Sequence, residues 1–147
     1  MEKLTKWDER FFELAQLVAQ WSKDESRKVG CVIVDQQKIV LSLGYNGFPR
    51  GIDDKIESRK QRPLKYFFTE HAEKNAIFNA ASVGRNLKGS TLYCTLFPCA
   101  ECAKAIIQSG ISEIISLSAN FSDKNLGKSF KVSNDLLCEA QIKIKTK

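Results

Sequence analysis

The chain has 147 residues, of which 43% are hydrophobic and 27% are charged, a length and composition that fit one globular domain with a single core. It contains no run of eighteen apolar residues, and near the N-terminus apolar residues are interleaved with charged ones. We therefore expect neither a membrane helix nor a signal peptide, and predict a cytoplasmic protein without a membrane partner. The formal net charge of +6 favours an anionic partner, but does not distinguish a polynucleotide from a free nucleotide.

The cysteine content argues against a disulfide framework. The five cysteines are odd in number, as expected in a reducing compartment. Cys31, Cys94 and Cys138 fall within the apolar patterns of expected strands or helices, where a small buried thiol is the ordinary explanation. We expect these three to lie in the core, which leaves Cys99 and Cys102 for other roles.

The first predicted elements are a helix and a hairpin. Large apolar residues recur at steps of four and three from Trp7 to Trp21, which predicts an amphipathic helix over about residues 5 to 22 that packs against the core. Two runs rich in β-branched residues follow at 28–34 and 38–45, and their short connection predicts an antiparallel hairpin.

An irregular segment comes next, over residues 46–69. Gly47, Pro49, Gly51 and Pro63 interrupt any regular element there. A connection of this length in a small domain is usually functional or disordered, and a solvated loop of mixed charge is an equally good interpretation of its middle part, 53–62.

Three further strands are expected in the second half, at 91–97, 111–118 and 141–145, with short helical patterns between them. Strands linked through helices favour parallel pairing. We predict a single α/β domain over residues 1–147, with helices packed on a central sheet.

A set of metal-binding residue types lies at two predicted helix starts. His71, the only histidine, opens a helix of small residues, and the sequence "PCAEC" places Cys99 and Cys102 on one side of the first turn of another. Backbone N–H groups at a helix start stabilise thiolate, the form of cysteine that binds metal. One imidazole and two thiolates suit zinc, and three protein ligands leave its fourth position to water. With no spare histidine, an open catalytic site is expected rather than a closed structural one.

Glu73 is the carboxylate expected to carry protons. It lies close to a ligand without being needed as one, and zinc lowers the pKa of its water enough to supply hydroxide at neutral pH. Residues two apart on an ideal helix point about 200° from each other, so we place His71 at the irregular opening of its helix.

Each part of this pattern has an alternative explanation. Cys99 and Cys102 alone fit a thiol redox pair, and a lone histidine at a helix start is commonly a hydrogen-bonded residue without a metal. His-x-Glu followed by Pro-Cys-x-x-Cys, however, is the signature of zinc deaminases, which predicts hydrolytic removal of an exocyclic amine from a nucleobase.

Nearly the whole chain resembles the deoxycytidylate deaminases of the cytidine and deoxycytidylate deaminase family. The similar stretches include "WSKD", "KVGCVIV", "GYNGFPRGIDD", "KYFFTEHAEKNAI" and "TLYCTLFPCAECAKAIIQSGI". The resemblance implies a three-layer α/β/α fold with a mixed five-stranded sheet and helices on both faces.

The same resemblance implies the reaction and its residues. One catalytic zinc ion per subunit is held by His71, Cys99 and Cys102. Glu73 delivers a proton to N3 of cytosine and then to ammonia while zinc-bound hydroxide attacks C4, so that dCMP becomes dUMP for thymidylate synthesis. Asn46 is expected to contact the 3′-hydroxyl of the sugar, and a tight turn at "YNG" is the alternative explanation for this residue. The backbone around Ala72 is expected to meet the carbonyl edge of the pyrimidine.

A 5′-phosphate requires guanidinium or ammonium donors. Arg27 is our first candidate and Lys23 our second, and an ordinary solvated charge is the alternative for each. Several relatives use a tyrosine after the fourth strand to bind phosphate. This chain has Phe121 there, which can pack against a substrate but cannot donate a hydrogen bond.

Regulation and assembly are also implied by the resemblance. Some relatives bind the effectors dCTP and dTTP near the "GFPRG" loop, where Arg50, Asp53 and Asp54 are candidate contacts. A homo-oligomer, either a dimer or a hexamer, is expected, with apolar faces around the hairpin and the terminal helix as candidate contacts. No second zinc ion is expected, since the chain has no spare histidine.

Two other functions remain open. The first is a zinc deaminase acting on another base carrier, such as cytidine, deoxycytidine, a free base or tRNA adenosine. The second is a non-catalytic, zinc-stabilised nucleotide-binding module, which would not need Glu73. A tRNA enzyme should expose aromatic residues for splayed bases, whereas most of the nine phenylalanines fall at core positions of the expected elements, so nucleic acid is not an expected partner.

Overall fold

The computed structural model describes residues 2–147. Its elements, in chain order, are α1 (Lys6–Ala19), β1 (Gly30–Val34), β2 (Val40–Tyr45), the 3₁₀ turn η1 (Glu57–Lys60), α2 (Lys65–Phe68), α3 (Ala72–Ser82), β3 (Thr91–Cys94), α4 (Ala100–Gln108), β4 (Glu113–Ser116), α5 (Gly127–Glu139) and β5 (Lys143–Thr146). The predicted hairpin, the three later strands and the first helix are all present, with shorter bounds than expected.

One mixed five-stranded sheet organises the molecule, in the order β2-β1-β3-β4-β5. β1 runs antiparallel to both β2 and β3, whereas β3, β4 and β5 are parallel. The expected parallel pairing therefore holds for the strands joined through α4 and α5. β2 and β3, which are joined through α3, also run in the same direction because both are antiparallel to β1, but they do not pair because β1 lies between them.

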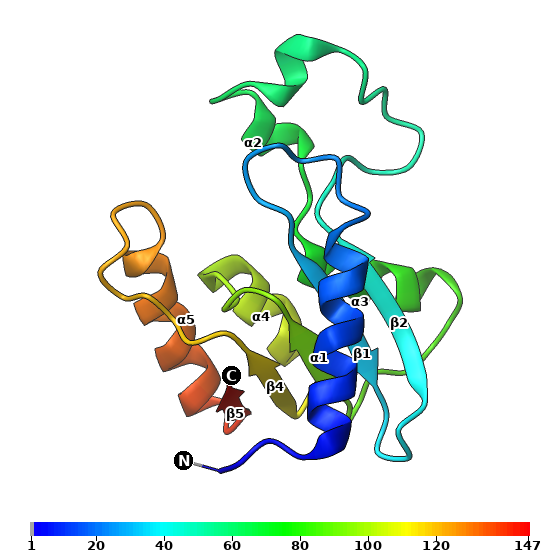
Figure 1. Ribbon diagram of the computed structural model, residues 1–147, viewed down its shortest axis with the longest axis vertical. Coiled ribbons are helices and arrows are strands. Elements are labelled where there is room, and N and C mark those ends of the chain that lie inside the picture. The colour runs from blue at the N-terminus through cyan, green and yellow to red at the C-terminus, as the bar shows by residue number, and fades with distance from the viewer. Residues whose placement is uncertain (1) are drawn as a thin grey trace.

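Both faces of the sheet are covered by helices, as predicted. Alternate residues of β1 point to opposite faces: Val32 joins the core beneath α1, and Ile33 joins the larger core beneath α3, α4 and α5. Figure 1 shows α1 crossing one face, with the other helices behind and beside the sheet. The fold is the expected three-layer α/β/α arrangement.

α1 begins at a capping box, in which the Thr5 hydroxyl accepts a hydrogen bond from the N–H of Asp8, and the Asp8 carboxylate accepts one from the N–H of Thr5. Phe11 and Val18 of its predicted stripe are buried, but Trp7 and Trp21 are about half exposed. The stripe therefore reaches beyond the sheet at both ends.

α3 lies unusually close to β2, because Gly44 has no side chain. A Cβ atom at Gly44 would collide with the backbone of Ala76 and Ala72. The Ser42 hydroxyl donates a hydrogen bond to the Ala76 carbonyl over 2.6 Å, and the Asn79 amide donates one to the Leu43 carbonyl over 2.8 Å. These contacts fix the position of α3, and of His71 at its start, relative to β2.

The irregular segment 46–69 is ordered by a few tertiary contacts and includes η1 and α2. Gly47 and Glu70 form a bridge at its base. The ring of Phe68 packs against Phe48, with centroids 5.6 Å apart, and the Arg59 guanidinium lies 4.6 Å from the centre of the same ring. Figure 1 shows this segment standing above one end of the sheet.

Two expectations about the core were wrong. Cys138 is exposed, because its position on α5 faces away from the sheet, whereas Cys31 and Cys94 are buried as expected. Only four of the nine phenylalanines are buried: Phe11, Phe12, Phe97 and Phe130. Phe67 is 84% exposed, since α2 lies in the overhanging segment rather than on the sheet.

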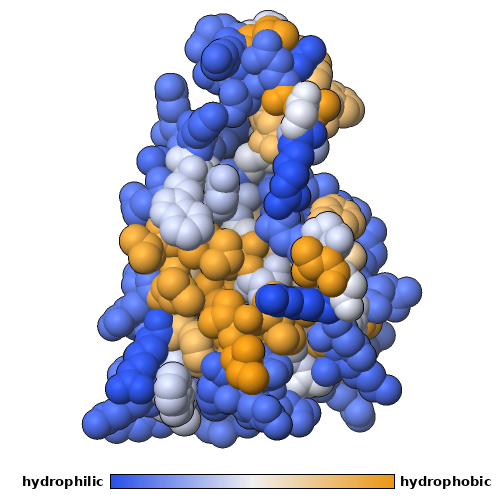
Figure 2. Space-filling view, turned by 90° about the vertical axis from the view of Figure 1, so that its right-hand side faces the viewer, coloured by the Kyte–Doolittle hydropathy of each residue, from blue (hydrophilic) through white to orange (hydrophobic). Residues whose placement is uncertain are grey.

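The surface near the edge strand β2 is partly apolar. Figure 2, which shows the molecule from that side, has a hydrophobic area at its centre bordered by hydrophilic residues. Ile39, Phe78 and Val83, from the hairpin and from α3 and its end, are more than half exposed. Assembly through the hairpin stays a prediction. Among residues 2–147, no helix has the length and apolar character required to cross a membrane.

Candidate metal centre and active site

The three predicted metal ligands meet at the starts of two helices. His71 is the N-cap of α3 and Cys99 is the N-cap of α4, both with extended backbone angles, while Cys102 lies in the first turn of α4. Because His71 is not yet helical, its ring and the Glu73 carboxylate can serve the same site. Neither N-cap side chain caps its own helix, so both are free to point between the two helix starts.

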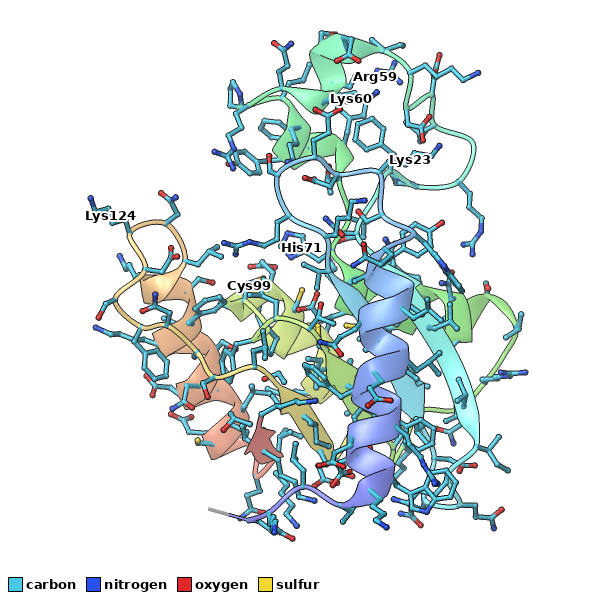
Figure 3. The ribbon with its side chains drawn as sticks, in the orientation of Figure 1. Lys23, Arg59, Lys60, His71, Cys99 and Lys124 are labelled. Carbon is cyan, nitrogen blue, oxygen red and sulfur yellow. The ribbon has the colours of Figure 1, made fainter. Side chains whose placement is uncertain are left out.

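The spacing of the ligand atoms fits zinc. The Nδ1 atom of His71 lies 3.4 Å from the sulfur of Cys99 and 3.3 Å from that of Cys102, and Figure 3 shows His71 and Cys99 facing each other at the centre of the molecule. Zinc–sulfur bonds of about 2.3 Å and zinc–nitrogen bonds of about 2.0–2.1 Å that meet at a tetrahedral angle hold sulfur and nitrogen about 3.5 Å apart. One nitrogen and two sulfurs are also a donor set that zinc prefers.

The electrostatics of the metal-free site favour a thiolate at Cys99, whereas the hydrogen bond with Cys99 and burial raise the pKa of the Cys102 thiol. The pKa of the Cys99 thiol is lowered to about 4, first by its hydrogen bond with Cys102 and, against the cost of burial, by its interaction with His71. The hydrogen bond with Cys99 in turn raises the pKa of His71 to about 9. A metal ion held here would take the place of the imidazolium proton, because only a neutral imidazole ligates a metal.

Glu73 lies behind the metal ligands, in a position almost sealed from solvent. Its side chain is buried, and burial is the main cause of a raised pKa for its carboxyl group. No salt bridge involves it within residues 2–147. A carboxyl group that is neither metal-ligated nor paired with a fixed cation is suited to exchange protons.

Glu73 also belongs to a second group of potential ligands, with the buried residues Cys31 and Cys94. Their sulfur and oxygen atoms lie within 4.8 Å of one another. Burial raises the pKa of both thiols. The expectation of a single zinc ion stays a prediction.

A cavity of about 330 Å³ opens above the ligands. His71, Ala72, Glu73 and Cys99 form its floor, and apolar side chains line its walls: Leu96, Phe97, Leu126 and Phe130. Charged residues also line it: Arg27, Arg62 and Asp123, and the largely buried pair of Lys65 and Asp24. The cavity thus combines an apolar slot with a charged rim, as a small polar ligand with an apolar ring requires.

Three of the predicted substrate contacts, Asn46, Ala72 and Arg27, line this cavity. The buried Asn46 amide accepts a hydrogen bond from the Val29 N–H and donates one to the Arg27 carbonyl, each over 2.8 Å. Asn46 therefore holds the loop that carries Arg27, and one N–H of its side chain remains available to a ligand.

Lys23 lies elsewhere. Its ammonium pairs with Asp54 over 2.7 Å, and both line a second cavity of about 300 Å³, which adjoins the first and shares Asn46 and Lys65 with it. Figure 3 shows Lys23 above His71, toward the segment that carries Arg59 and Lys60. The Lys23 side chain thus faces away from the pocket in which it was expected.

The other predicted contacts also lie outside the main cavity. Phe121 is 41% exposed and does not line it. Arg50 donates a hydrogen bond to the Asn79 side chain over 2.6 Å, and Asp53 accepts one from the N–H of Lys55 over 2.8 Å. Of the three candidate effector contacts, only Asp54 lines the second cavity.

Sequence reasoning missed three residues of the cavity, Arg62, Lys65 and Tyr66, which come from the overhanging segment 46–69. The sequence "RPLKY" offers a cluster of cations next to a tyrosine, but its placement depends on how the segment folds back. The Lys65 ammonium pairs with Asp24 over 2.9 Å, and this largely buried ion pair fastens the segment to the loop before β1.

Comparisons with known proteins agree with this geometry. The family model described as the cytidine and deoxycytidylate deaminase zinc-binding region matches residues 5–118. An uncharacterized deaminase of Aliivibrio fischeri is 41% identical over 143 residues, covering 96% of this chain and 93% of that protein. The deoxycytidylate deaminase of Homo sapiens is 41% identical over 125 residues, covering 82% of this chain and 69% of the human protein.

Among solved structures, the dCMP deaminase of the cyanophage S-TIM5 in complex with dCMP and dUMP has a similar fold. The TM-score is 0.80 and the sequence identity is 26%, over 99% of this chain and all of the phage protein. The likeness extends through α5 and β5, beyond the region that the family model matches.

Proposed function

Because the chain belongs to the cytidine and deoxycytidylate deaminase family, we propose that it is a zinc-dependent hydrolase that converts dCMP and water to dUMP and ammonia. One observation carries the proposal. His71, Cys99 and Cys102 converge beside the buried Glu73, at the floor of a cavity whose walls are apolar and whose mouth carries cations.

Zinc held by His71, Cys99 and Cys102 supplies a Lewis acid that lowers the pKa of a water molecule at its open position. The Glu73 carboxylate would accept a proton from the attacking water and pass it to N3 of the cytosine as the water oxygen bonds to C4. The remaining proton of that hydroxyl group would then pass through Glu73 to the exocyclic nitrogen, so that the C4–N bond breaks, a C4 carbonyl forms and ammonia leaves. The burial that raises the pKa of Glu73 supports this role, because a proton shuttle must both hold and release a proton.

The remaining residues of the cavity orient the substrate. The backbone at Ala72 is the proposed contact of the pyrimidine carbonyl edge, with Phe97 and Phe130 on the wall that excludes water from the ring. The free N–H of Asn46 is the proposed donor to the 3′-hydroxyl of the sugar. Arg27, at the mouth of the cavity, is placed to pair with the 5′-phosphate.

The second cavity is a candidate effector site. Lys23, Lys60 and Asp54 line it, so it offers cations for phosphate and a carboxylate for a metal ion or a base. Regulation by dCTP and dTTP, and assembly into a dimer or hexamer, stay predictions.

The function is tested by incubating the zinc-loaded protein with dCMP, CMP, deoxycytidine and cytosine. Release of ammonia and the ultraviolet change from cytosine to uracil report turnover. We expect conversion of dCMP with the highest kcat/KM of the four. A higher kcat/KM for deoxycytidine or cytosine would favour another base carrier, and no turnover of any compound would favour a non-catalytic binding module.

A further inference from the structure

Three cations line the mouth of the active-site cavity, and two of them have carboxylate neighbours. Lys65 is paired with Asp24. The pKa of Asp123 is lowered first by hydrogen bonds from the N–H groups of Leu126 and Asn125, and further by the charge of Arg27, which places Arg27 near that carboxylate. Arg62 forms no salt bridge within residues 2–147, so its charge is the least compensated of the three.

Arg62 lies beside a tyrosine that lines the same cavity. The carbon at the centre of its guanidinium is 5.9 Å from the centre of the Tyr66 ring, and Tyr66 is 62% exposed. The ring supports the guanidinium, while the phenolic hydroxyl remains a hydrogen-bond donor. The pair therefore presents a fork of N–H groups and one O–H group at the cavity mouth.

The segment that carries this pair is anchored on the side that faces the cavity. The side chains of Lys65 and Asp24 are only 14% and 9% exposed, so their ion pair is shielded from solvent. Lys65 lies between Arg62 and Tyr66 in the chain, and its N–H donates a hydrogen bond to the Gln61 carbonyl over 2.8 Å. These contacts anchor the stretch of chain that carries Arg62 and Tyr66 beside the cavity.

From this arrangement we propose that Arg62 and Tyr66 form a binding subsite for a phosphate monoester, which selects nucleotides over nucleosides. A monoester carries close to two negative charges at neutral pH and several acceptor oxygens, so it can engage the Arg62 fork and the Tyr66 hydroxyl together. Arg27 approaches the same mouth from the loop before β1. The inference rests on the proposed deaminase function of this cavity and identifies how its substrate is chosen.

The subsite also accounts for Phe121. A phenylalanine after β4 cannot donate a hydrogen bond to phosphate, and in this fold it lies outside the cavity. Tyr66 supplies a phenolic hydroxyl from a different segment. Phosphate recognition in this chain then depends on segment 46–69 and does not require a tyrosine after β4.

The test compares dCMP with deoxycytidine in Arg62→Ala, Arg62→Lys and Tyr66→Phe variants of the zinc-loaded protein. Hydrogen bonds to charged groups contribute about 1.5–3 kcal/mol, so we expect Arg62→Ala to lower kcat/KM for dCMP about 10- to 100-fold, mainly through KM. Activity on deoxycytidine should stay unchanged. Arg62→Lys should restore part of the loss, because a lysine keeps the charge but not the fork. Tyr66→Phe should produce a smaller loss, confined to dCMP.

Lys55→Ala is the matched control, because Lys55 lies on the same segment, is exposed and lines neither cavity. Its activity on dCMP should equal that of the wild type. Calorimetric binding of dUMP and deoxyuridine gives a second readout that needs no turnover, and Arg62→Ala should weaken only the binding of dUMP.

The outcomes separate the two proposals. If the wild type converts dCMP but Arg62→Ala affects dCMP and deoxycytidine equally, the subsite is wrong and the deaminase function stands. If no compound is converted, the proposed function fails, and the binding of dUMP then decides the subsite alone. Tighter binding of a short deoxycytidine oligonucleotide than of dUMP would overturn the assignment to a monoester.

Discussion

At the scale of single residues, the site depends on two residues that precede their helices and have non-helical backbone angles. His71 and Cys99 occupy N-cap positions, where an extended backbone turns each side chain toward the other helix start. Glu73, two residues later, is already helical and buried. One short stretch of chain therefore supplies both a candidate ligand and a candidate proton carrier.

The role of Glu73 predicts a variant that binds zinc but does not turn over. Glu73→Gln keeps the shape of the side chain and removes its ability to shuttle protons, so we expect kcat on dCMP to fall by about 10²- to 10⁴-fold. Zinc content, measured by plasma mass spectrometry, should stay near one ion per chain. Retention of most of the wild-type rate would exclude Glu73 as the proton carrier.

Removing a metal ligand should have a different signature. Cys99→Ala leaves two of the three ligands, so we expect zinc content to fall far below one ion per chain and the melting temperature to drop. A ligand present at 100 times its Kd stabilises a protein by about 2.7 kcal/mol, which is the scale of the expected loss. Cys138→Ala, at an exposed cysteine of α5, is the control and should change neither quantity.

The sequence predicted the ligands more reliably than the substrate contacts. His71, Glu73, Cys99 and Cys102 follow from spacing, because two helix starts fix their positions. Lys23 was selected for its closeness to Arg27 in the chain, but the two side chains diverge and Lys23 reaches Asp54 instead. The direction of an exposed lysine in a loop depends on tertiary partners that sequence spacing does not reveal.

At the scale of elements, the position of the site depends on how closely α3 packs on β2. Gly44→Ala tests this directly, since the new methyl group would collide with the backbone of Ala72 and Ala76. We expect a loss of about 1–3 kcal/mol or more in the free energy of unfolding, because overpacking forces the helix to move. Zinc affinity should fall as well, since the moved helix begins at His71.

Gly47→Ala is the matched control for this prediction. A Cβ atom at Gly47 has nothing within 4 Å, and its backbone angles do not require glycine. Chemical denaturation and zinc titration of the two variants supply the measurements. Equal stabilities would mean that α3 can shift outward without cost.

Regular elements were predictable because their patterns are local, whereas segment 46–69 was not. The hairpin and α1 follow from alternation and from apolar spacing. The overhanging segment is instead ordered by the packing of Phe68 against Phe48 and Arg59 and by the pairing of Lys65 with Asp24, contacts between distant positions. For this reason Arg62 and Tyr66 were not foreseen as cavity residues.

At the scale of the whole molecule, a buried polar cluster joins the beginning, middle and end of the chain. The Tyr93 hydroxyl of β3 donates a hydrogen bond to Asp8 of α1 over 2.9 Å. Lys145 of β5 lies 3.6 Å from Asp8 and 3.0 Å from Glu113, and Glu2 borders the same ammonium. The sheet and its N-terminal helix are therefore coupled through charge as well as through apolar packing.

This cluster predicts how stability depends on acid. Burial opposes the charge of Asp8, but hydrogen bonds from Thr5 and Tyr93 and the charge of Lys145 outweigh it, so the pKa of Asp8 is lowered from 3.8. A carboxylate whose pKa is lower in the folded than in the unfolded chain stabilises the protein at pH values above the unfolded pKa. This contribution is lost as the pH falls through the folded pKa. The free energy of unfolding should therefore decline below about pH 4.

Asp8→Asn should lower the free energy of unfolding at pH 7 by about 1–3 kcal/mol and make the decline below pH 4 shallower. Urea denaturation at several pH values measures both effects. Asp135→Asn, at an exposed position of α5, is the control and should retain the wild-type slope. An unchanged slope in Asp8→Asn would show that other carboxylates govern acid unfolding.

α5 and β5 contribute to the cavity and to the buried polar cluster, although both lie beyond the region that the family model matches. The match ends at residue 118, but α5 supplies Phe130 to the cavity wall and β5 places Lys145 beside Asp8. A recombinant fragment that ends at residue 118 would lack one wall of the pocket and open it to solvent. It would also leave β4 as an unprotected edge strand, which can pair with another chain. Any shortened or chimeric version of the protein should therefore keep α5 and β5 together with residues 5–118.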